Sequence, residues 1–272
     1  MSRAAQAGLF RSLHQLDQVL VLPNAWDVIS ARVFEDCGFP AIGTTSFGIA
    51  RAHGLKDGAN AARECSLEMV RRMTAALAVP LTADLEAGYA TSASEVEQTG
   101  RAFIEAGAVG FNVEDGQPDP AQPLVEITRH CERIAALKQA GRAMDVPVFV
   151  NARTDVFWLE VGKPSARLEA ALRRADAYLA AGADGIFIPG LGDAATIREA
   201  VRAIAAPLNL LAGPNTPPVP VLRGLGVKRL SVGSGPMRAT LGLLKDIAAE
   251  LQGAGTYGYL DRALAYHDAN GL

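Results

Sequence analysis

The chain lacks long apolar runs, basic clusters and a leader-like beginning. No stretch approaches the roughly 18 to 20 consecutive apolar residues that a membrane-spanning helix needs. The formal net charge is −3 and lysines and arginines form no run, which argues against nucleic acid as the main partner. The opening MSRAAQAGLFRSLHQL is interrupted too often by polar residues for a secretory segment. We therefore expect a cytoplasmic protein that binds neither membranes nor nucleic acid.

Cysteine is scarce as well. The chain contains three cysteines, Cys37, Cys65 and Cys131. Their odd number and unpaired spacing argue against a disulfide framework and against a zinc site. All three lie in segments with a helical pattern, so we expect them to be small buried apolar side chains. The G-x-G-x-x-G fingerprint of dinucleotide-binding folds is also missing after the first predicted strand.

What the sequence does contain is an alternation of short β-rich runs and longer alanine-rich segments. The predicted strands are residues 19–23, 41–45, 80–84, 109–114, 147–152, 185–189, 207–212 and 229–233. The predicted helices are residues 27–37, 60–78, 92–106, 124–140, 165–181, 193–205, 217–225 and 236–252. Ser92, with Glu95 three residues later, forms a capping-box pattern, and Asp193 can cap the helix that follows it.

Eight strands, each followed by a helix, are typical of a (β/α)8 TIM barrel. The strand runs are continuously apolar, as expected for parallel strands covered on both faces. A doubly wound open sheet is the main alternative, but it normally has fewer units and a glycine fingerprint. Because no linker or composition break is present, we expect residues 1–272 to form one α/β barrel domain. Extra helices are expected at about 2–15 and 257–269.

Polar side chains collect at the carboxyl ends of these strands, where barrel enzymes place their active sites. Asp84 and Glu86 end the third strand, and Glu114 ends the fourth. Asp57 lies in the loop GLKDG after the second strand. The i, i+2 spacing of Asp84 and Glu86 puts both carboxylates on one side of the strand. Further polar residues on or after the strands are Asn24, Thr44, Asn112, Asn151, Asn209 and Ser231.

The acids repel one another unless a positive charge lies between them. Carboxylate ligands without a histidine or cysteine partner favour Mg²⁺, or Mn²⁺, over zinc. The alternative is that each acid caps a helix or pairs with a surface lysine. Because three acids end adjacent strands, we expect a metal site on Asp84, Glu86 and Glu114.

An anion site is expected beside the metal. Arg153 follows the buried run VFVNA near the same rim, where it would bind a carboxylate or phosphate bidentately. The alternative is a structural ion pair with Asp155 or Glu114. Residues 45–48, TSFG, supply hydroxyl and N–H groups for an anion-binding nest, although an ordinary turn is the alternative. Position and charge thus predict a barrel enzyme that holds a divalent cation and an anionic substrate.

Five motifs resemble the isocitrate lyase / phosphoenolpyruvate mutase superfamily. They are NAWDVISARVFEDCGFPAIGTTS, GLKDG, ADLEAGYA, GFNVED and VNARTD, in the order of the family. The resemblance implies a (β/α)8 barrel with extra terminal helices. It also implies an enzyme that acts on 2-oxo or 2-hydroxy acids through an enolate-like intermediate stabilised by Mg²⁺. It also implies a homotetramer, a dimer of dimers, in which a C-terminal helix is exchanged between subunits.

The resemblance assigns roles to the acids. Asp84 matches the direct Mg²⁺ ligand of the family and lies beside the substrate. Glu86 and Glu114, and more loosely Asp57, match acids that hold the metal through water. Glu86 stands where the family more often has aspartate, which adds a methylene group and keeps the charge.

It also assigns roles to the residues that bind the substrate. Arg153 matches the arginine that holds the substrate carboxylate. Thr45, Ser46 and Phe47 match the segment whose hydroxyl and amide groups hold the carboxylate and the oxo group. The acid that reprotonates carbon is left open among water, Tyr89 and a residue of a mobile lid.

Two departures from the family change the expected activity. The loop EDGQPDPAQPLVE, residues 114–126, lacks the K-[KR]-C-G-H motif of isocitrate and methylisocitrate lyases. It also lacks the lysine and asparagine of the phosphonopyruvate-processing members. Pro189 ends the sixth strand where the mutases have a histidine. The loop therefore has the composition of a lid with different chemistry.

Cleavage or decarboxylation of an oxaloacetate- or methylisocitrate-like dicarboxylate needs the least beyond the shared core. We therefore expect a Mg²⁺-dependent carbon–carbon lyase. One alternative is a C–P bond enzyme that acts on phosphonopyruvate or phosphoenolpyruvate. Another is a non-catalytic protein that binds a 2-oxo acid.

Overall fold

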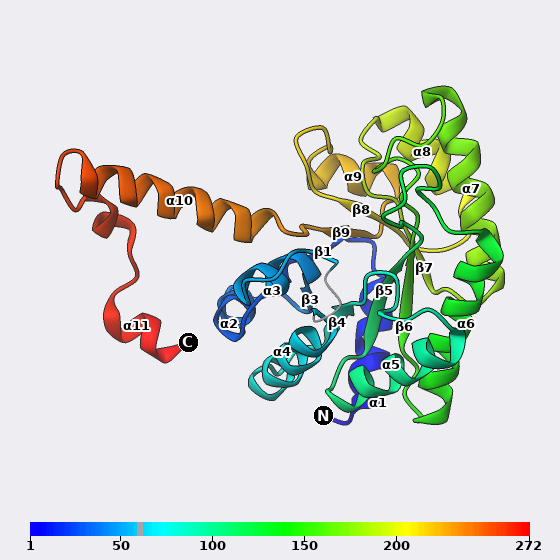
Figure 1. Cartoon of the computed structure of the whole chain (residues 1–272), viewed down its shortest axis with the longest axis horizontal. Coiled ribbons are helices and arrows are strands. Elements are labelled where there is room, and N and C mark those ends of the chain that lie inside the picture. The colour runs from blue at the N-terminus through cyan, green and yellow to red at the C-terminus, as the bar shows by residue number, and fades with distance from the viewer. Residues whose placement is uncertain (59–61) are drawn as a thin grey trace.

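The computed structural model describes residues 1–58 and 62–272, in which parallel strands form the core and helices surround it (Figure 1). The strands are β1 (Leu20–Leu22), β2 (Asn24–Ala25), β3 (Ile42–Thr44), β4 (Leu81–Asp84), β5 (Gly110–Glu114), β6 (Phe149–Arg153), β7 (Gly185–Phe187), β8 (Leu208–Leu211) and β9 (Arg229–Ser231). The helices around them are α2 (Val28–Asp36), α3 (Ser46–Ala52), α4 (Ala62–Ala76), α5 (Ala93–Glu105), α6 (Ile127–Ala143), α7 (Pro164–Ala180), α8 (Ala194–Ala203) and α9 (Val219–Leu225). All eight predicted strands are present.

The first predicted strand is divided at Pro23, and this division closes the barrel. β1 pairs with β9, whereas β2 pairs with β3, and every pairing in the sheet is parallel. Pro23 lies between β1 and β2 and has no N–H to donate to a ladder. Its carbonyl accepts a hydrogen bond from the Gly43 N–H at 2.8 Å, on the β3 side. The chain thus changes neighbours at Pro23, and the sheet forms the predicted (β/α)8 barrel.

Helix α1 (Arg3–Leu13) closes the amino-terminal end of the barrel, as the extra helix predicted at 2–15. Phe10 on this helix is fully buried, and His14, just after it, stacks on Phe149 of β6 with ring centroids 4.0 Å apart. Gly110 of β5 makes room for this packing, since a Cβ there would lie 2.8 Å from the Phe10 ring. The amino end is therefore a packed plug, and the opposite, carboxyl end remains available for a site.

Helix caps follow the sequence patterns. Ser92 and Glu95 form the predicted capping box of α5, and the Asp193 side chain accepts from the Thr196 N–H at 2.8 Å. The sequence patterns did not predict α3, which begins directly after β3. Residues 60 and 61 of the helix predicted at 60–78 lie outside the described residues. The terminal helix predicted at 257–269 is formed as the short helices η1 (Gly258–Arg262) and α11 (Tyr266–Gly271).

The expected burial of the cysteines is wrong. Cys37 is exposed, while Cys65 and Cys131 are half-buried, and all three are free thiols within the described part of the chain. Cys37 caps the C-terminus of α2 immediately before Gly38, which has a positive φ of 84°. Cys37 therefore faces solvent at the end of an outer helix, whereas Cys65 and Cys131 lie within α4 and α6.

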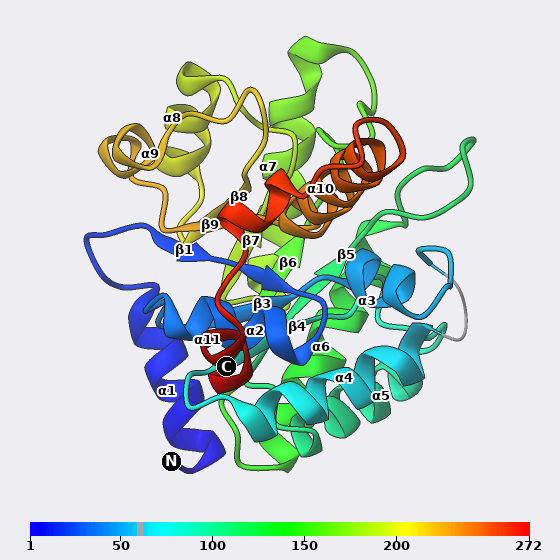
Figure 2. The same cartoon turned by 90° about the vertical axis from the view of Figure 1, so that its left-hand side faces the viewer.

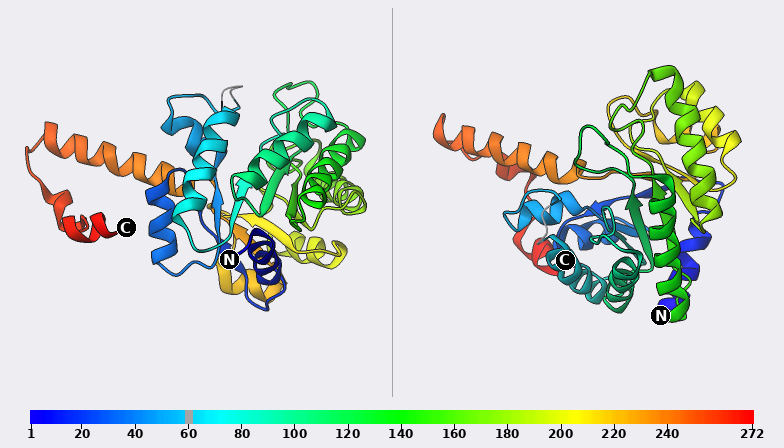
Figure 3. Two further views of the ribbon diagram at one scale, coloured as in Figure 1. Left: turned by 90° about the horizontal axis from the view of Figure 1, so that it is seen from below. Right: turned by 45° about the vertical axis from the view of Figure 1, so that its right-hand side comes forward.

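Helix α10 (Gly235–Gln252) leaves the barrel and extends away from it (Figures 1 and 3). Met237 is its one buried residue. The chain then returns through η1 and α11, and the Leu272 carbonyl accepts from Arg32 Nε on α2 at 2.8 Å. In the described residues, no helix has the length and apolar character to span a membrane.

Candidate active site

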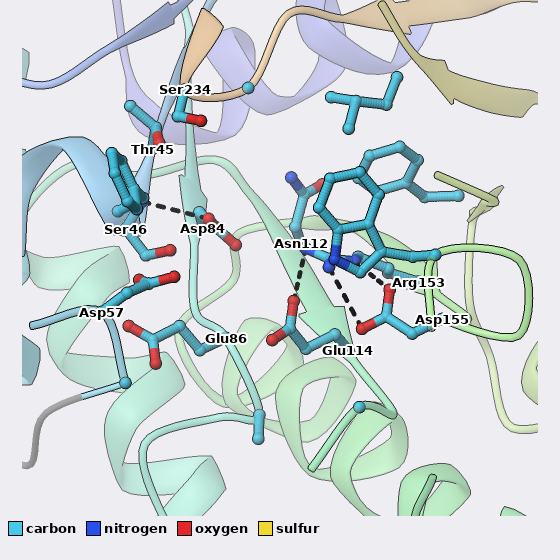
Figure 4. A pocket seen from close by; sticks show the side chains of 18 of the residues that line it. Thr45, Ser46, Asp57, Asp84, Glu86, Asn112, Glu114, Arg153, Asp155 and Ser234 are labelled. Atoms are coloured by element: carbon cyan, nitrogen blue, oxygen red, sulfur yellow. Dashed lines mark hydrogen bonds and ion pairs between the residues drawn. The ribbon is translucent and has the colours of Figure 1, made fainter. Parts of the chain in front are cut away.

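A cavity of about 980 Å³ lies at the carboxyl ends of the strands (Figure 4). It is lined by every residue that the sequence singled out for the site: Thr45, Ser46, Phe47, Asp57, Asp84, Glu86, Tyr89, Glu114 and Arg153. The fold brings them together because they end or follow four neighbouring parallel strands, β3 to β6, whose carboxyl ends meet at one rim. The loop after β5, which projects from the barrel (Figure 2), contributes Gly116, Gln117 and Pro118 to the lining.

Asp84 is held in place by Thr44 of β3 and Ser46 of α3. Its own N–H donates to Thr44 Oγ1 at 2.9 Å, and its Oδ2 accepts from the Ser46 N–H at 3.2 Å. The register pairs Asp84 with Asn112 of β5. The other carboxylate oxygen, Oδ1, is left for partners in the cavity. Asp84 is therefore the acid with the most fixed position.

Glu86 lies in a strained turn after β4. Glu86 and Tyr89 have positive φ values of 50° and 52°, a conformation that costs non-glycine residues of the order of 1 kcal/mol each. The Glu86 carbonyl accepts from the Glu114 N–H at 2.8 Å, which ties the turn to β5. Oε1 of Glu86 is buried without a hydrogen-bond partner among the residues described. Burial raises the pKa of Glu86 to about 7, and the charges of Asp84 and Asp57 act in the same direction.

Asp57 lies at the mouth of the cavity and is the most exposed of the acids. Burial of part of its carboxyl group raises its pKa, and the charge of Asp84 adds to this effect. Figure 4 shows Asp57, Asp84, Glu86 and Glu114 on the same side of the cavity. Burial is the main cause of the raised pKa values in this group, and the mutual repulsion of the acids adds to it.

Arg153 is engaged by two acids, which is the ion-pair arrangement that the sequence left open. Its Nη1 lies 2.6 Å from Glu114 Oε2, and its Nε donates to Asp155 Oδ1 at 2.6 Å. Burial opposes the guanidinium charge, but Glu114 and Asp155 outweigh this and raise the pKa of Arg153. Burial likewise raises the pKa of Glu114, with the Arg153 charge acting against it.

Thr45, Ser46 and Phe47 begin α3. Thr45 caps this helix, with Oγ1 accepting from the Gly48 N–H at 3.3 Å. Two N–H groups of the expected anion-binding nest therefore already have acceptors within the chain. The Gly48 N–H donates to Thr45 Oγ1, and the Ser46 N–H donates to Asp84 Oδ2. The cavity still borders the buried hydroxyl-bearing side chains of Thr45 and Ser46.

Sequence reasoning named Asp155 only as an alternative ion-pair partner of Arg153, and it missed several other lining residues. Asp155 is 3% exposed and orients the Arg153 guanidinium. The centre of the Phe187 ring lies 5.7 Å from the Arg153 guanidinium carbon. Phe187 ends β7, a strand that has no polar residue at its carboxyl end to indicate a role in the site. Trp158, 52% exposed, and Leu159 add an apolar wall for which the sequence carried no signal.

A metal ion fits this donor set in one particular way. Within residues 1–58 and 62–272, no group of three or more His, Cys, Asp or Glu side chains is arranged to bind a metal ion directly. A Mg²⁺ ion bound directly by Asp84, and through water by Glu86 and Glu114, requires no such arrangement. The unpartnered Glu86 oxygen and the mutual repulsion of the acids both favour a cation here.

Two curated relatives act on small carboxylic acids, as their names state. The chain is 29% identical to the 2-methylisocitrate lyase of Bacillus subtilis, over 76% of this chain and 67% of the relative. It is 32% identical to the oxaloacetate decarboxylase of Rhodopseudomonas palustris, over 71% and 65%. An uncharacterised protein of Mycobacterium tuberculosis is 36% identical, over 85% and 84%.

Solved structures have the same fold. A Burkholderia cenocepacia protein proposed to be a lyase or mutase matches with a TM-score of 0.91 and 35% identity, over 98% of this chain and 95% of that one. A phosphonopyruvate hydrolase in complex with oxalate and Mg²⁺ matches with a TM-score of 0.84 and 26% identity, over 97% and 93%.

The family model of phosphoenolpyruvate phosphomutase matches residues 10–252. This span runs from the plug helix α1 to the end of α10 and includes every strand and every lining acid. The chain therefore belongs to the phosphoenolpyruvate phosphomutase family, within the isocitrate lyase / phosphoenolpyruvate mutase superfamily.

Proposed function

We propose that the protein is a Mg²⁺-dependent carbon–carbon lyase or decarboxylase. Its substrate would be a small 2-oxo or 2-hydroxy dicarboxylate that resembles oxaloacetate or methylisocitrate. The observation that carries the proposal is the cluster of four acids that lines one cavity together with Arg153. The similarity to a 2-methylisocitrate lyase and an oxaloacetate decarboxylase supports the same substrate class.

Asp84 would bind Mg²⁺ directly, and Glu86, Glu114 and Asp57 would hold its water ligands. Mn²⁺ would suit the same oxygen donors. Bound Mg²⁺ would supply positive charge where negative charge develops on the substrate oxygens. The similarity to a structure solved with oxalate and Mg²⁺ supports this choice of metal.

Arg153 would bind a substrate carboxylate. Asp155 holds the guanidinium through Nε and Nη2, which leaves the Nη1 edge, now paired with Glu114, for the ligand. A substrate carboxylate at this edge would release Glu114 from its ion pair. Glu114 would then be free to hold a water ligand of the metal.

Tyr89 is our candidate for the proton donor. Its hydroxyl lies 3.2 Å from Ser66 Oγ at the wall of the cavity. Burial, followed by the charge of Glu86, raises the pKa of Tyr89 well above its ordinary value. The hydroxyl therefore stays protonated at neutral pH, as a donor of a proton to carbon requires. Water and the lid loop remain the other two sources.

The assembly would be a homotetramer with an exchanged C-terminal region. Helix α10 carries large apolar side chains that are at least 43% exposed: Leu241, Leu243, Leu244 and Leu251. A row of exposed leucines on a helix that leaves its own barrel is suited to packing against a second copy. A cytoplasmic location agrees with such an enzyme and stays a prediction.

A C–P bond enzyme is the second candidate. It is favoured by the phosphoenolpyruvate phosphomutase family model and by the similarity to a phosphonopyruvate hydrolase. Against it, the loop at 114–126 lacks the lysine and asparagine of the phosphonopyruvate-processing members, and Pro189 stands where the mutases have a histidine. Phosphorus NMR of the protein with phosphonopyruvate and Mg²⁺ would detect this reaction directly.

Proton NMR with a substrate panel tests the lyase. The panel is oxaloacetate, 2-methylisocitrate, isocitrate and dimethylmalate, each with Mg²⁺ and with EDTA. We expect one compound to yield a 2-oxo product only with metal, and the Asp84→Ala variant to lose this activity. Glu132→Ala, at an exposed position of α6, is the matched control and should retain it. Metal-dependent stabilisation by a ligand, with no product from any compound, would indicate a binding protein instead.

A further inference from the structure

Asn112 lies in the floor of the cavity. It is the middle inward-facing residue of β5, between Gly110 and Glu114, and it is 6% exposed. In the sheet it is paired with Asp84 on one side and with Asn151 on the other. Figure 4 shows its amide between Asp84 and Arg153. A ligand held by those two residues would therefore lie over Asn112.

The orientation of this amide is decided by a buried arginine. Arg229 of β9 is 1% exposed, and its Nη2 donates to Asn112 Oδ1 at 3.2 Å. A guanidinium carries only donors, so the Asn112 atom that faces it must be the oxygen. The Asn151 Nδ2 donates to the same oxygen at 2.8 Å. With two donors on Oδ1, a flip of the amide would set N–H groups against N–H groups.

The other end of the amide is then a donor that faces the ligand. Nδ2 of Asn112 has no acceptor among the described residues, yet it is not one of the fully buried unpartnered atoms. It is therefore open to the cavity. A nearly buried donor without a partner is costly, and an oxygen of a bound ligand would remove that cost.

Arg229 is itself fixed from several sides. Its Nε donates to Ser231 Oγ at 3.3 Å, and its guanidinium carbon lies 5.9 Å from the centre of the Phe10 ring. Among the salt bridges of the described chain, none neutralises Arg229. It thus adds positive charge beneath a cavity that is otherwise crowded with acids, which favours an anionic ligand above it.

We propose that Asn112 is a substrate-binding residue whose Nδ2 donates to a carboxylate or 2-oxo oxygen, and that Arg229 is the positioning residue that locks its amide. This inference rests on the proposed function for the class of ligand, a small 2-oxo acid. It adds an uncharged donor, deep in the barrel, to the contacts expected from Arg153 and α3.

The Asn112→Asp variant is the sharpest test. An aspartate satisfies Arg229 and Asn151 as well as the asparagine does, but it replaces the donor facing the ligand with an acceptor. The matched control is Asn209→Asp, at a buried residue of β8 that is 1% exposed, donates to Ser231 and does not line the cavity. Asn112→Ala removes the donor without adding charge.

The probe is oxalate, titrated calorimetrically in the presence of Mg²⁺, with Mg²⁺ binding and the melting temperature measured separately. We expect Asn112→Asp to weaken oxalate binding at least about tenfold more than Asn209→Asp, with the fold intact and Mg²⁺ still bound. Asn112→Ala should weaken it in the same direction. Arg229→Met should weaken it as well, and Arg229→Lys, which is also donor-only, should restore part of the loss.

The outcomes separate this inference from the lyase proposal. If oxalate binds and depends on Asn112, but no panel compound is turned over, the lyase fails and the Asn112 contact stands. If turnover occurs while Asn112→Asp and Asn112→Ala bind oxalate as the wild type does, only the Asn112 contact is overturned. If the wild type binds no oxalate in the presence of Mg²⁺, the Asn112 contact is overturned, whatever the panel shows.

Discussion

Arg153 and Glu114 form an ion pair of 2.6 Å between neighbouring strands, at positions that the sheet register places side by side. One is the predicted substrate arginine and the other a predicted metal acid. The one positive charge of Arg153 is shared between Glu114 and Asp155. Binding of a metal and a carboxylate would give Arg153 and Glu114 each a new partner of opposite charge.

Arg153→Lys tests the bidentate role of this arginine. Lysine keeps the charge but cannot hold Asp155 and a substrate carboxylate with a planar fork of donors. Hydrogen bonds to charged groups contribute about 1.5 to 3 kcal/mol each, so loss of one should reduce kcat/KM by roughly 10- to 100-fold. Arg101→Lys, which alters an exposed pair with Glu97, is the control. Equal kcat/KM in wild type and Arg153→Lys would contradict a bidentate contact.

Two buried histidines should each remove stability from the fold in mild acid, whereas the raised pKa values of Glu86 and Glu114 act in the opposite direction. Burial lowers the pKa of His130 to about 3, and it lowers that of His14 to about 3 as well. Below the ordinary pKa of about 6.5 the unfolded chain binds these protons and the folded chain does not. The contribution of each histidine to the free energy of unfolding should therefore drop by about 1.4 kcal/mol per pH unit as pH falls below 6.5, with no such loss above it.

His130→Phe isolates one of these contributions. Relative to wild type, the variant should become steadily more stable between pH 6.5 and pH 5, as measured by urea unfolding. His267→Phe is the control, because its side chain is 84% exposed. Parallel curves of stability against pH for wild type and His130→Phe would contradict this assignment.

Much of the fold and of the acid cluster could be predicted because both depend on local pattern. Apolar runs bounded by glycine or proline define the strands, and the residues that end parallel strands meet at one edge. The division at Pro23 could not be predicted, since it depends on which neighbour each half of the strand pairs with. Helix α3 is short and follows a strand directly, so its pattern could not be distinguished from a turn.

The inner network of the barrel was hidden for a different reason. Arg229 begins a predicted strand, a position where arginine normally faces solvent. Its two-residue spacing from Ser231 was the one hint that it faces inward. The partners that fix it, Asn112 and Phe10, come from distant parts of the chain, and no local pattern reports such contacts. The simultaneous pairing of Arg153 with Glu114 and Asp155 could likewise be recognised only from the distances between their side-chain atoms.

Tyr178→Phe should destabilise the support beneath the site. The Tyr178 hydroxyl donates to Asp115 Oδ2 at 2.6 Å, and Asp115 Oδ1 accepts from the Asp155 N–H at 2.8 Å. Removing the hydroxyl leaves a fully buried carboxylate with one donor fewer, at a cost of about 1 to 3 kcal/mol. Urea unfolding measures the change, and Tyr257→Phe, at a 64% exposed position, is the control. Arg174 Nη1 also donates to Asp115 Oδ2, at 3.1 Å. A loss no larger than that of the control would show that Arg174 and the Asp155 N–H satisfy Asp115 without the tyrosine.

The exchanged assembly can be tested on α10. Leu243 and Leu244 are 53% and 55% exposed in the single chain, and burial of each in a subunit interface would contribute about 1.5 to 3 kcal/mol. The double change Leu243→Glu with Leu244→Glu should therefore reduce a tetramer to a smaller species, which light scattering after gel filtration detects. Val221→Glu, on α9 and 45% exposed, adds charge elsewhere on the surface and should leave the assembly unchanged. Because both leucines lie outside the cavity lining, oxalate binding by the smaller species should survive unless a neighbouring subunit helps to form the site. A wild-type protein that is monomeric at micromolar concentration would contradict the exchange altogether.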